Sequence, residues 1–261
     1  MAEAEYQFGL AREHCKDCRE YHAVWPYVWL TRARGDGLAA DRETLGSLLQ
    51  QHCPPKGKVL IAGAADFRLL ALSHDALITR KARFAVTDRC HTPLLVCGHH
   101  AQAHGFRVDT FQSDFAQAPI AQHCDVVLSH NVLMWLPRAQ HAAMLRGLAS
   151  WLSRTGTLIL VASRISASVE PDETTYPQRM VEALASRGIP LPEPEPAFRK
   201  RLAAYATLRN ERRKHVASLD EIAREIESAG LRLSARIESD RPASGEAAIR
   251  ASEIFVATRG D

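Results

Sequence analysis

The sequence Lys58-Val59-Leu60-Ile61-Ala62-Gly63-Ala64-Ala65-Asp66 decides the fold of this chain. It is an apolar run that ends in a turn of small residues. A second apolar run, Phe84-Ala85-Val86-Thr87, is closed by Asp88. A strand, a tight turn, a helix and an acidic residue after the next strand form a layout that holds adenosine-bearing cofactors. The sequence therefore predicts a nucleoside site where these two strands end.

Strands and helices alternate from Lys58 for about a hundred residues, which predicts parallel strands joined by helical crossovers. Further strands are expected at 108–111, 124–129 and 157–162, and helices from residues 67, 92 and 137, with Thr92 as an N-cap. Ser218 opens a capping box for a later helix. Apolar runs at 231–237 and 253–258 suit an antiparallel hairpin. The fold class is α/β, with a doubly wound, Rossmann-like sheet.

Two segments lie outside this alternation. Residues 13–30 are rich in aromatic residues and predict one helix, which Pro26 is expected to kink or end, and residues 53–57 form a linker. We expect the core at 56–261, with an insertion at about 166–215. Its first part, 166–196, contains prolines that favour an extended path. Its second part, 197–215, predicts a basic helix.

Composition limits the class of protein. The chain has 261 residues, of which 46% are apolar and 24% charged, so it can bury a core of its own. It has neither an apolar run long enough for a membrane nor a secretory signal, which places it in the cytoplasm. Its 33 basic and 30 acidic residues nearly cancel, which makes a nucleic-acid partner unlikely on charge alone. We interpret the six cysteines as thiols.

The order of elements resembles the class I methyltransferases that use S-adenosylmethionine, over about residues 56–165 and 216–261. The resemblance implies a seven-stranded sheet with an antiparallel last strand. It also implies an N-terminal helical lid and linker over residues 1–55. The implied activity is transfer of a methyl group from S-adenosylmethionine to a small-molecule acceptor, which could be anionic. The oligomeric state stays open, a homodimer included.

The same resemblance implies which residues bind the cofactor. Asp88 matches the acid that holds the ribose, Asp114 can accept from the adenine amine, and Phe115 can stack on the base. One departure is Ile61, which stands where the family has an acid, so Asp66 is the candidate to replace it. The full set follows the four strand ends: Ala62, Gly63, Ala64 and Asp66; Asp88 and Arg89; Ser113, Asp114 and Phe115; Ser129 and His130.

Polar residues near the expected acceptor give the remaining candidates. His130, His22 and Tyr21 are the catalytic candidates, since a histidine can act as a base near neutral pH. The substrate-binding candidates are Tyr27, Asn131, Tyr205 and Arg209, of which the last two share a helix face. For each histidine a purely structural role is the alternative.

Cys15, Cys18 and His22 would share one side of the predicted helix, and zinc accepts such ligands. A single CxxC without a second ligand pair at the usual spacing is a weak signal, so the sequence predicts no metal site.

Three other functions stay open. A nicotinamide-dependent oxidoreductase has a similar sheet, although the GxGxxG spacing is absent. An RNA-directed methyltransferase would use the basic residues between Arg199 and Lys214. A cysteine-based metal or redox module is the third.

Overall fold

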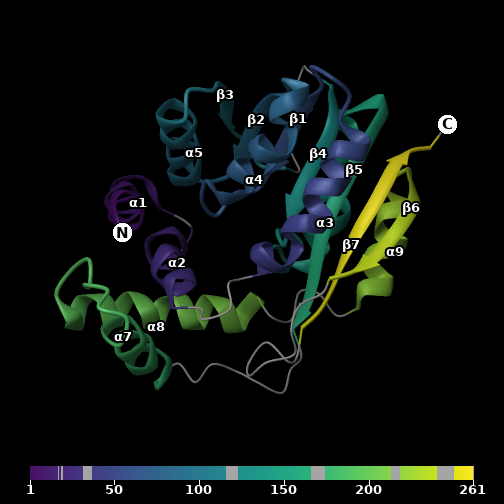
Figure 1. The fold of residues 1–261 in the computed structure, drawn as a ribbon. Helices are drawn as coiled ribbons and strands as arrows, with labels where there is room; N and C mark the ends of the chain where they lie inside the picture. The colour runs from purple at the N-terminus through teal and green to yellow at the C-terminus, as the bar shows by residue number, and fades with distance from the viewer. Residues whose placement is uncertain are drawn as a thin grey trace.

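Seven strands form one sheet in the computed structural model, in the order β3-β2-β1-β4-β5-β7-β6 (Figure 1). The strand β7 runs antiparallel to both of its neighbours, β5 and β6, while β1 to β5 pair in parallel. The predicted α/β sheet with an antiparallel last strand is thus confirmed. The strands span Lys58–Ala62 (β1), Arg83–Asp88 (β2), Val108–Gln112 (β3), Cys124–His130 (β4), Leu152–Ile165 (β5), Leu231–Glu238 (β6) and Arg250–Arg259 (β7).

The structure describes residues 1–16, 18, 20–31, 37–115, 123–165, 174–212, 218–239 and 250–260. Parts of the predicted insertion, at 166–173 and 213–215, lie outside the described residues, and Arg213 and Lys214 of the basic run are among them.

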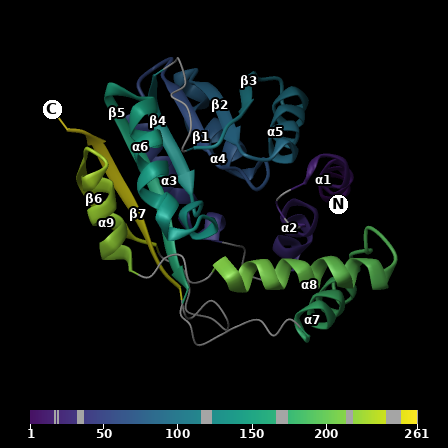
Figure 2. The same cartoon turned by 180° about the vertical axis from the view of Figure 1, so that it is seen from behind.

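Helices cover both faces of the sheet. The helices α3 (Gly37–His52), α4 (Arg68–Leu77) and α5 (His91–Ala103) pack on one face, and α6 (Arg138–Trp151) and α9 (Leu219–Ser228) on the other (Figures 1 and 2). Successive residues of β1 point to opposite faces. Ile61 therefore joins the apolar cluster of Leu49 in α3, and Leu60 joins that of Leu145 in α6. The N-terminal unit 1–55 was expected to form a lid and linker, but its helix α3 belongs to the packed core.

Four helices form a separate layer beside the sheet. They are α1 (Ala2–His14), α2 (Tyr21–Leu30), α7 (Tyr176–Ala185) and α8 (Glu195–Arg212). In both views α8 lies across α2, with α7 against it (Figures 1 and 2). Their apolar cluster includes Phe8, Leu184 and Phe198. We call these four helices the lid layer; it joins the N-terminus to the insertion.

The predicted single helix over 13–30 is wrong, because the chain leaves the helix after His14 and enters a new one at Tyr21. Glu20 takes a φ of 68°, in the left-handed region that breaks a helix. Pro26 was expected to kink or end the second helix, yet α2 continues to Leu30. Proline has no N–H for the carbonyl of His22, and Gln7 Nε2 donates to that oxygen instead, at 3.1 Å.

Two further expectations change. Cys90, and not Thr92, is the N-cap of α5, and the Thr92 Oγ1 lies 3.0 Å from the Cys15 Sγ. The expected extended path through 166–196 contains the helix α7, whose buried Tyr176, Met180 and Leu184 recur every four residues. That spacing was the signal that could have found it.

Two short 3₁₀ turns complete the described elements, Ile78–Arg80 and Leu133–Trp135. Within the described ranges, no helix has the length and apolarity that crossing a bilayer requires.

Candidate active site

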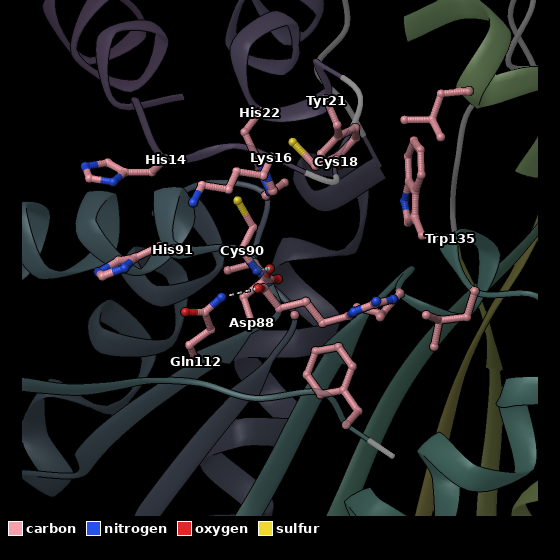
Figure 3. Close-up of a pocket in the computed structure, with 18 of the residues that line it drawn as sticks. His14, Lys16, Cys18, Tyr21, His22, Asp88, Cys90, His91, Gln112 and Trp135 are labelled. Carbon is pink, nitrogen blue, oxygen red and sulfur yellow. Dashed lines mark hydrogen bonds between the residues drawn. The ribbon is translucent and has the colours of Figure 1, made fainter. Parts of the chain in front are cut away.

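A cavity of about 560 Å³ lies where β1, β2, β3 and β4 end. Gly63, Asp88, Gln112 and His130 line it from the sheet. The segment between α1 and α2 lines it from the side of the lid layer, where Lys16 and Cys18 lie across from Asp88 and Gln112 (Figure 3). Ligands of open α/β sheets bind at this edge, and the volume falls within the range of small-molecule sites. The cavity is therefore the candidate site.

The turn after β1 brings the backbone close to the cavity. Gly63 has a φ of 84°, and a Cβ there would lie 2.3 Å from the Val132 Cγ2, so only glycine fits. The amide of Ala64 donates to Asp88 Oδ2 at 3.0 Å, and the amide of Cys90 donates to Asp88 Oδ1 at 2.7 Å. Burial raises the pKa of Asp88. The carboxylate keeps further lone pairs, which can accept hydrogen bonds from hydroxyl groups of a ligand.

At the end of β3 the cavity is lined by a residue that the sequence analysis did not name. Gln112 lines the cavity and donates through Nε2 to the Arg89 carbonyl at 2.7 Å (Figure 3). The sequence interpretation missed it, although it is the last residue of its strand. Arg89 and Phe115 also line the cavity, and the Phe115 ring is buried edge-on against Trp151 at 6.2 Å.

Five of the predicted residues, Ala62, Ser113, Asp114, Ser129 and Tyr27, do not line either cavity. Ser129 is fully buried and donates through Oγ to the Ala62 carbonyl at 3.0 Å, so these two residues join β4 to β1. Ser113 and Asp114 follow β3, and the Asp114 carboxylate lies 3.7 Å from Arg89 Nε outside the cavity. Tyr27 was expected to bind substrate, but it is fully buried in the lid layer, because it lies on the apolar side of α2.

A smaller cavity of about 100 Å³ adjoins the first. Tyr205 and Arg209 of α8, two of the substrate-binding candidates, line it, and so does Asn131. The ring of Tyr21 lies 4.4 Å from that of Trp135 and 6.0 Å from that of Tyr205. Burial raises the pKa of Tyr21 well above its usual value. The walls of this cavity thus include several aromatic rings and two cationic side chains, those of Arg68 and Arg209.

Asp66 is already held by other side chains. Its carboxylate accepts from the Trp25 indole at 2.9 Å and forms an ion pair with Arg68 at 2.8 Å. It also accepts from the Arg68 amide at 2.8 Å, which caps the first turn of α4. Asp66 lines the smaller cavity with its charge balanced by Arg68.

His130 lines both cavities and is held from two sides. Its Nε2 lies 3.0 Å from Oδ2 of the buried Asp41, on α3. Since a carboxylate only accepts, we assign the ring proton to Nε2. Asn131 Nδ2 lies 3.4 Å from Nδ1, and Ser163 Oγ, which donates to Asn131 Oδ1 at 2.6 Å, sets that amide. Asp41 lies 89 residues from His130 in sequence, and no local pattern could have revealed it.

Three thiols and an imidazole meet on the wall of the larger cavity. The side chains of Cys15, Cys18, His22 and Cys90 place one ligand atom each within 4.8 Å of one another. Hydrogen bonds from Cys15 and Cys18 lower the pKa of Cys90, and a hydrogen bond with Cys18 raises that of Cys15. Burial would lower the pKa of His22, but Cys18 and Cys90 raise it to about 10.

The sheet order and the ligand edge are those of class I methyltransferases. Residues 69–160 match a family model described as a methyltransferase domain. The match and the sheet order identify a class I methyltransferase domain, and the enzyme uses S-adenosylmethionine as its methyl donor. No curated protein sequence matches the chain.

Three solved structures illustrate the fold. One is a putative zinc-dependent alcohol dehydrogenase from Rhodobacter sphaeroides, with 15% identity, coverage of 94% of this chain and 100% of the other, and a TM-score of 0.59. The magnesium protoporphyrin IX methyltransferase of Synechocystis, with S-adenosylhomocysteine bound, has 17% identity, coverage of 93% and 98%, and a TM-score of 0.56. A putative sarcosine dimethylglycine methyltransferase from Galdieria sulphuraria has 11% identity, coverage of 84% of each chain, and a TM-score of 0.56. At these identities the likeness concerns the fold alone.

Proposed function

We propose that this enzyme methylates a small molecule, with the methyl donor in the larger cavity and the acceptor in the smaller one. The observation that carries the proposal is their common wall, since Tyr21, Gly63, Ala64, Ala65, His130 and Trp135 line both cavities. An acceptor in the smaller cavity lies next to the cofactor, between the sheet edge and α8. Holding the two reactants together in this way supplies most of the rate of such a transfer.

The residues around the larger cavity suit the cofactor. S-adenosylmethionine supplies an electrophilic methyl group when it is bound. The Asp88 carboxylate would accept from the two ribose hydroxyls, in charge-assisted hydrogen bonds. The turn at Gly63 would place its backbone against the ligand, since Gly63 lines the cavity, and a side chain there would meet Val132. Gln112 and Phe115 would contact the adenine.

His130 is the proposed general base for an acceptor that arrives protonated. With Nε2 donating to Asp41, Nδ1 keeps its lone pair to take a proton from a hydroxyl or amine. Its contact with Asn131, at 3.4 Å, is long enough for an acceptor to replace. His22 is a poorer candidate, because its ring is buried and its Nδ1 lies 3.5 Å from the Cys15 Sγ. Tyr21 would contact the acceptor with its ring.

The acceptor is expected to be compact and to carry a negative charge. Arg209 lines the smaller cavity and forms no ion pair with any described residue, so it can bind a carboxylate or phosphate. A nucleic-acid acceptor has less support, since Arg199 and Arg201 of the basic run pair with Glu195 and Glu193. The six cysteines form no disulfide in the structure, which suits a reducing compartment, and we place the enzyme in the cytoplasm.

Calorimetry with S-adenosylhomocysteine tests the cofactor assignment. Asp88→Asn should weaken binding roughly 10- to 100-fold, because a charge-assisted hydrogen bond contributes about 1.5–3 kcal/mol. Asp109→Asn is the matched control, since Asp109 is exposed on β3 and lines neither cavity. NADH should not bind. Unchanged affinity in Asp88→Asn, or binding of NADH alone, would refute the proposal.

A further inference from the structure

Four side chains from three parts of the chain meet at one point. Cys15 and Cys18 come from the segment between α1 and α2, His22 from the first turn of α2, and Cys90 from the turn after β2. Figure 3 shows Cys18 and Cys90 on the cavity wall, near His22 and above Asp88. Cys15 and Cys18 lie in the non-helical stretch between α1 and α2, and both side chains lie near those of His22 and Cys90.

The spacing of the four atoms is that of ligands around one metal ion. In a tetrahedral zinc site, bonds of about 2.3 Å to sulfur and about 2.0 Å to nitrogen place two sulfurs about 3.8 Å apart and a sulfur about 3.5 Å from a nitrogen. The Cys15 and Cys90 sulfurs are 3.4 Å apart, and the Cys15 sulfur is 3.5 Å from His22 Nδ1. All four ligand atoms lie within 4.8 Å of one another, so they can surround a common centre.

The donor set selects the kind of metal. Soft thiolates favour zinc over magnesium, calcium or manganese, and three cysteines with one histidine are a usual set for zinc. The cluster is mostly shielded from solvent, with His22 buried and the three cysteines half-buried. The Thr92 hydroxyl, 3.0 Å from the Cys15 sulfur, can donate to a thiolate there and orient it.

We propose that Cys15, Cys18, His22 and Cys90 bind one zinc ion. Four protein ligands fill a tetrahedral site, so the zinc is structural and leaves no position for a substrate. Cys90 supplies the ligand that the sequence pattern lacked, 75 residues from Cys15.

The zinc would join the lid layer to the loop that holds the cofactor. Cys90 donates its amide to the Asp88 carboxylate at 2.7 Å, so fixing Cys90 also fixes Asp88. On the other side, Gln7 holds the His22 carbonyl and also donates to the Ala65 carbonyl at 2.9 Å, in the glycine turn. This second part of the inference rests on the proposed function, because it assumes that Asp88 binds the cofactor.

Metal analysis of the purified full chain tests the zinc site directly. The protein should be prepared without an affinity tag that binds metals, and elemental mass spectrometry should find about one zinc per chain. Cys18→Ser should retain at most about a tenth of that amount, because removing a ligand opens the site. Cys53→Ser is the matched control: Cys53 lies outside the cluster, and a hydroxyl can keep its bond to the Pro54 carbonyl. It should keep its zinc.

A second measurement covers the case in which Cys18→Ser does not fold. Zinc is removed from the wild-type protein with a chelator, and cobalt is added in its place. Thiolate ligands then give a cobalt charge-transfer band, and tetrahedral geometry gives intense visible bands. Wild-type protein that takes up neither zinc nor cobalt would overturn the proposal, as would a disulfide between Cys15 and Cys90 or full zinc content in folded Cys18→Ser.

Calorimetry with S-adenosylhomocysteine separates the two parts of the inference. Zinc-free protein should bind the ligand about tenfold more weakly than zinc-loaded protein. Equal affinities would refute the link to Asp88 while leaving the metal site in place. If neither form binds the ligand, the proposed function fails, whereas the zinc content still decides the metal site.

Discussion

His100 is a buried histidine of α5 that lines neither cavity. Its ring stacks on Phe67 at 4.4 Å and lies 4.0 Å from the ring of His104. Burial and the neighbouring His104 lower its pKa to about 4, from an ordinary value of 6.5. The other titratable groups that act on it are His74, His99 and Asp75, and only Asp75 favours the charged form. The folded protein therefore holds this ring neutral.

This histidine should make the fold sensitive to acid. Between pH 6.5 and about pH 4 the unfolded chain binds a proton at His100 that the folded chain does not. The free energy of unfolding should therefore fall by about 1 kcal/mol per pH unit as pH falls through this window, and this contribution should stay constant above it. Urea denaturation at pH 7 and pH 5 measures the loss. His100→Gln should remove it, whereas exposed His123→Gln should not; equal losses in both variants would contradict the assignment.

At the scale of elements, Gln7 explains how α2 tolerates a proline. Gln7 is 2% exposed and donates to two carbonyls, one in α2 and one in the glycine turn after β1. The first of these carbonyls, that of His22, is the one that Pro26 leaves without a partner. The side chain of one helix thus completes the hydrogen bonding of the next and joins both to the sheet edge.

A double-mutant cycle tests this role. Gln7→Leu should lower the free energy of unfolding by about 1–3 kcal/mol, because it leaves buried carbonyls without donors. Pro26→Ala supplies an N–H for the His22 carbonyl, so Gln7→Leu should have a smaller effect in that background. Urea denaturation of the four proteins measures the coupling between the two positions. Additive effects would show that Gln7 does not compensate for the proline.

The elements that the sequence predicted well are those with a local signal. The strands β1, β2 and β4 are short apolar runs between turns, and their end residues Gly63, Asp88 and His130 reach the cavity because parallel strands end at one edge. The break at residues 15–20 had no such signal, since Lys16 and Glu20 are ordinary helix formers. The contacts of His130 with Asp41 and of Cys15 with Cys90 join distant segments, which only the folded chain reveals.

At the scale of the whole molecule, the lid layer has a core of its own. Its apolar cluster of residues from α1, α2, α7 and α8 is distinct from the two clusters that pack on the sheet. Polar contacts join it to the sheet edge, such as those of Trp25 with Asp66 and of Gln7 with Ala65. The ligand cavity lies between the two parts. A layer held in this way can open locally while the sheet stays folded.

Hydrogen exchange should detect that opening and its control by the cofactor. Binding of S-adenosylhomocysteine should slow amide exchange in α1, α2 and the turn at 63–65, because the ligand contacts both walls of the cavity. The strands β5, β6 and β7 line neither cavity and should exchange as before. Asp88→Asn is the control, since under the same ligand concentration its lid layer should stay unprotected. If the ligand slows exchange at the strand ends but leaves exchange in α1 and α2 unchanged, the lid layer does not cover the cofactor.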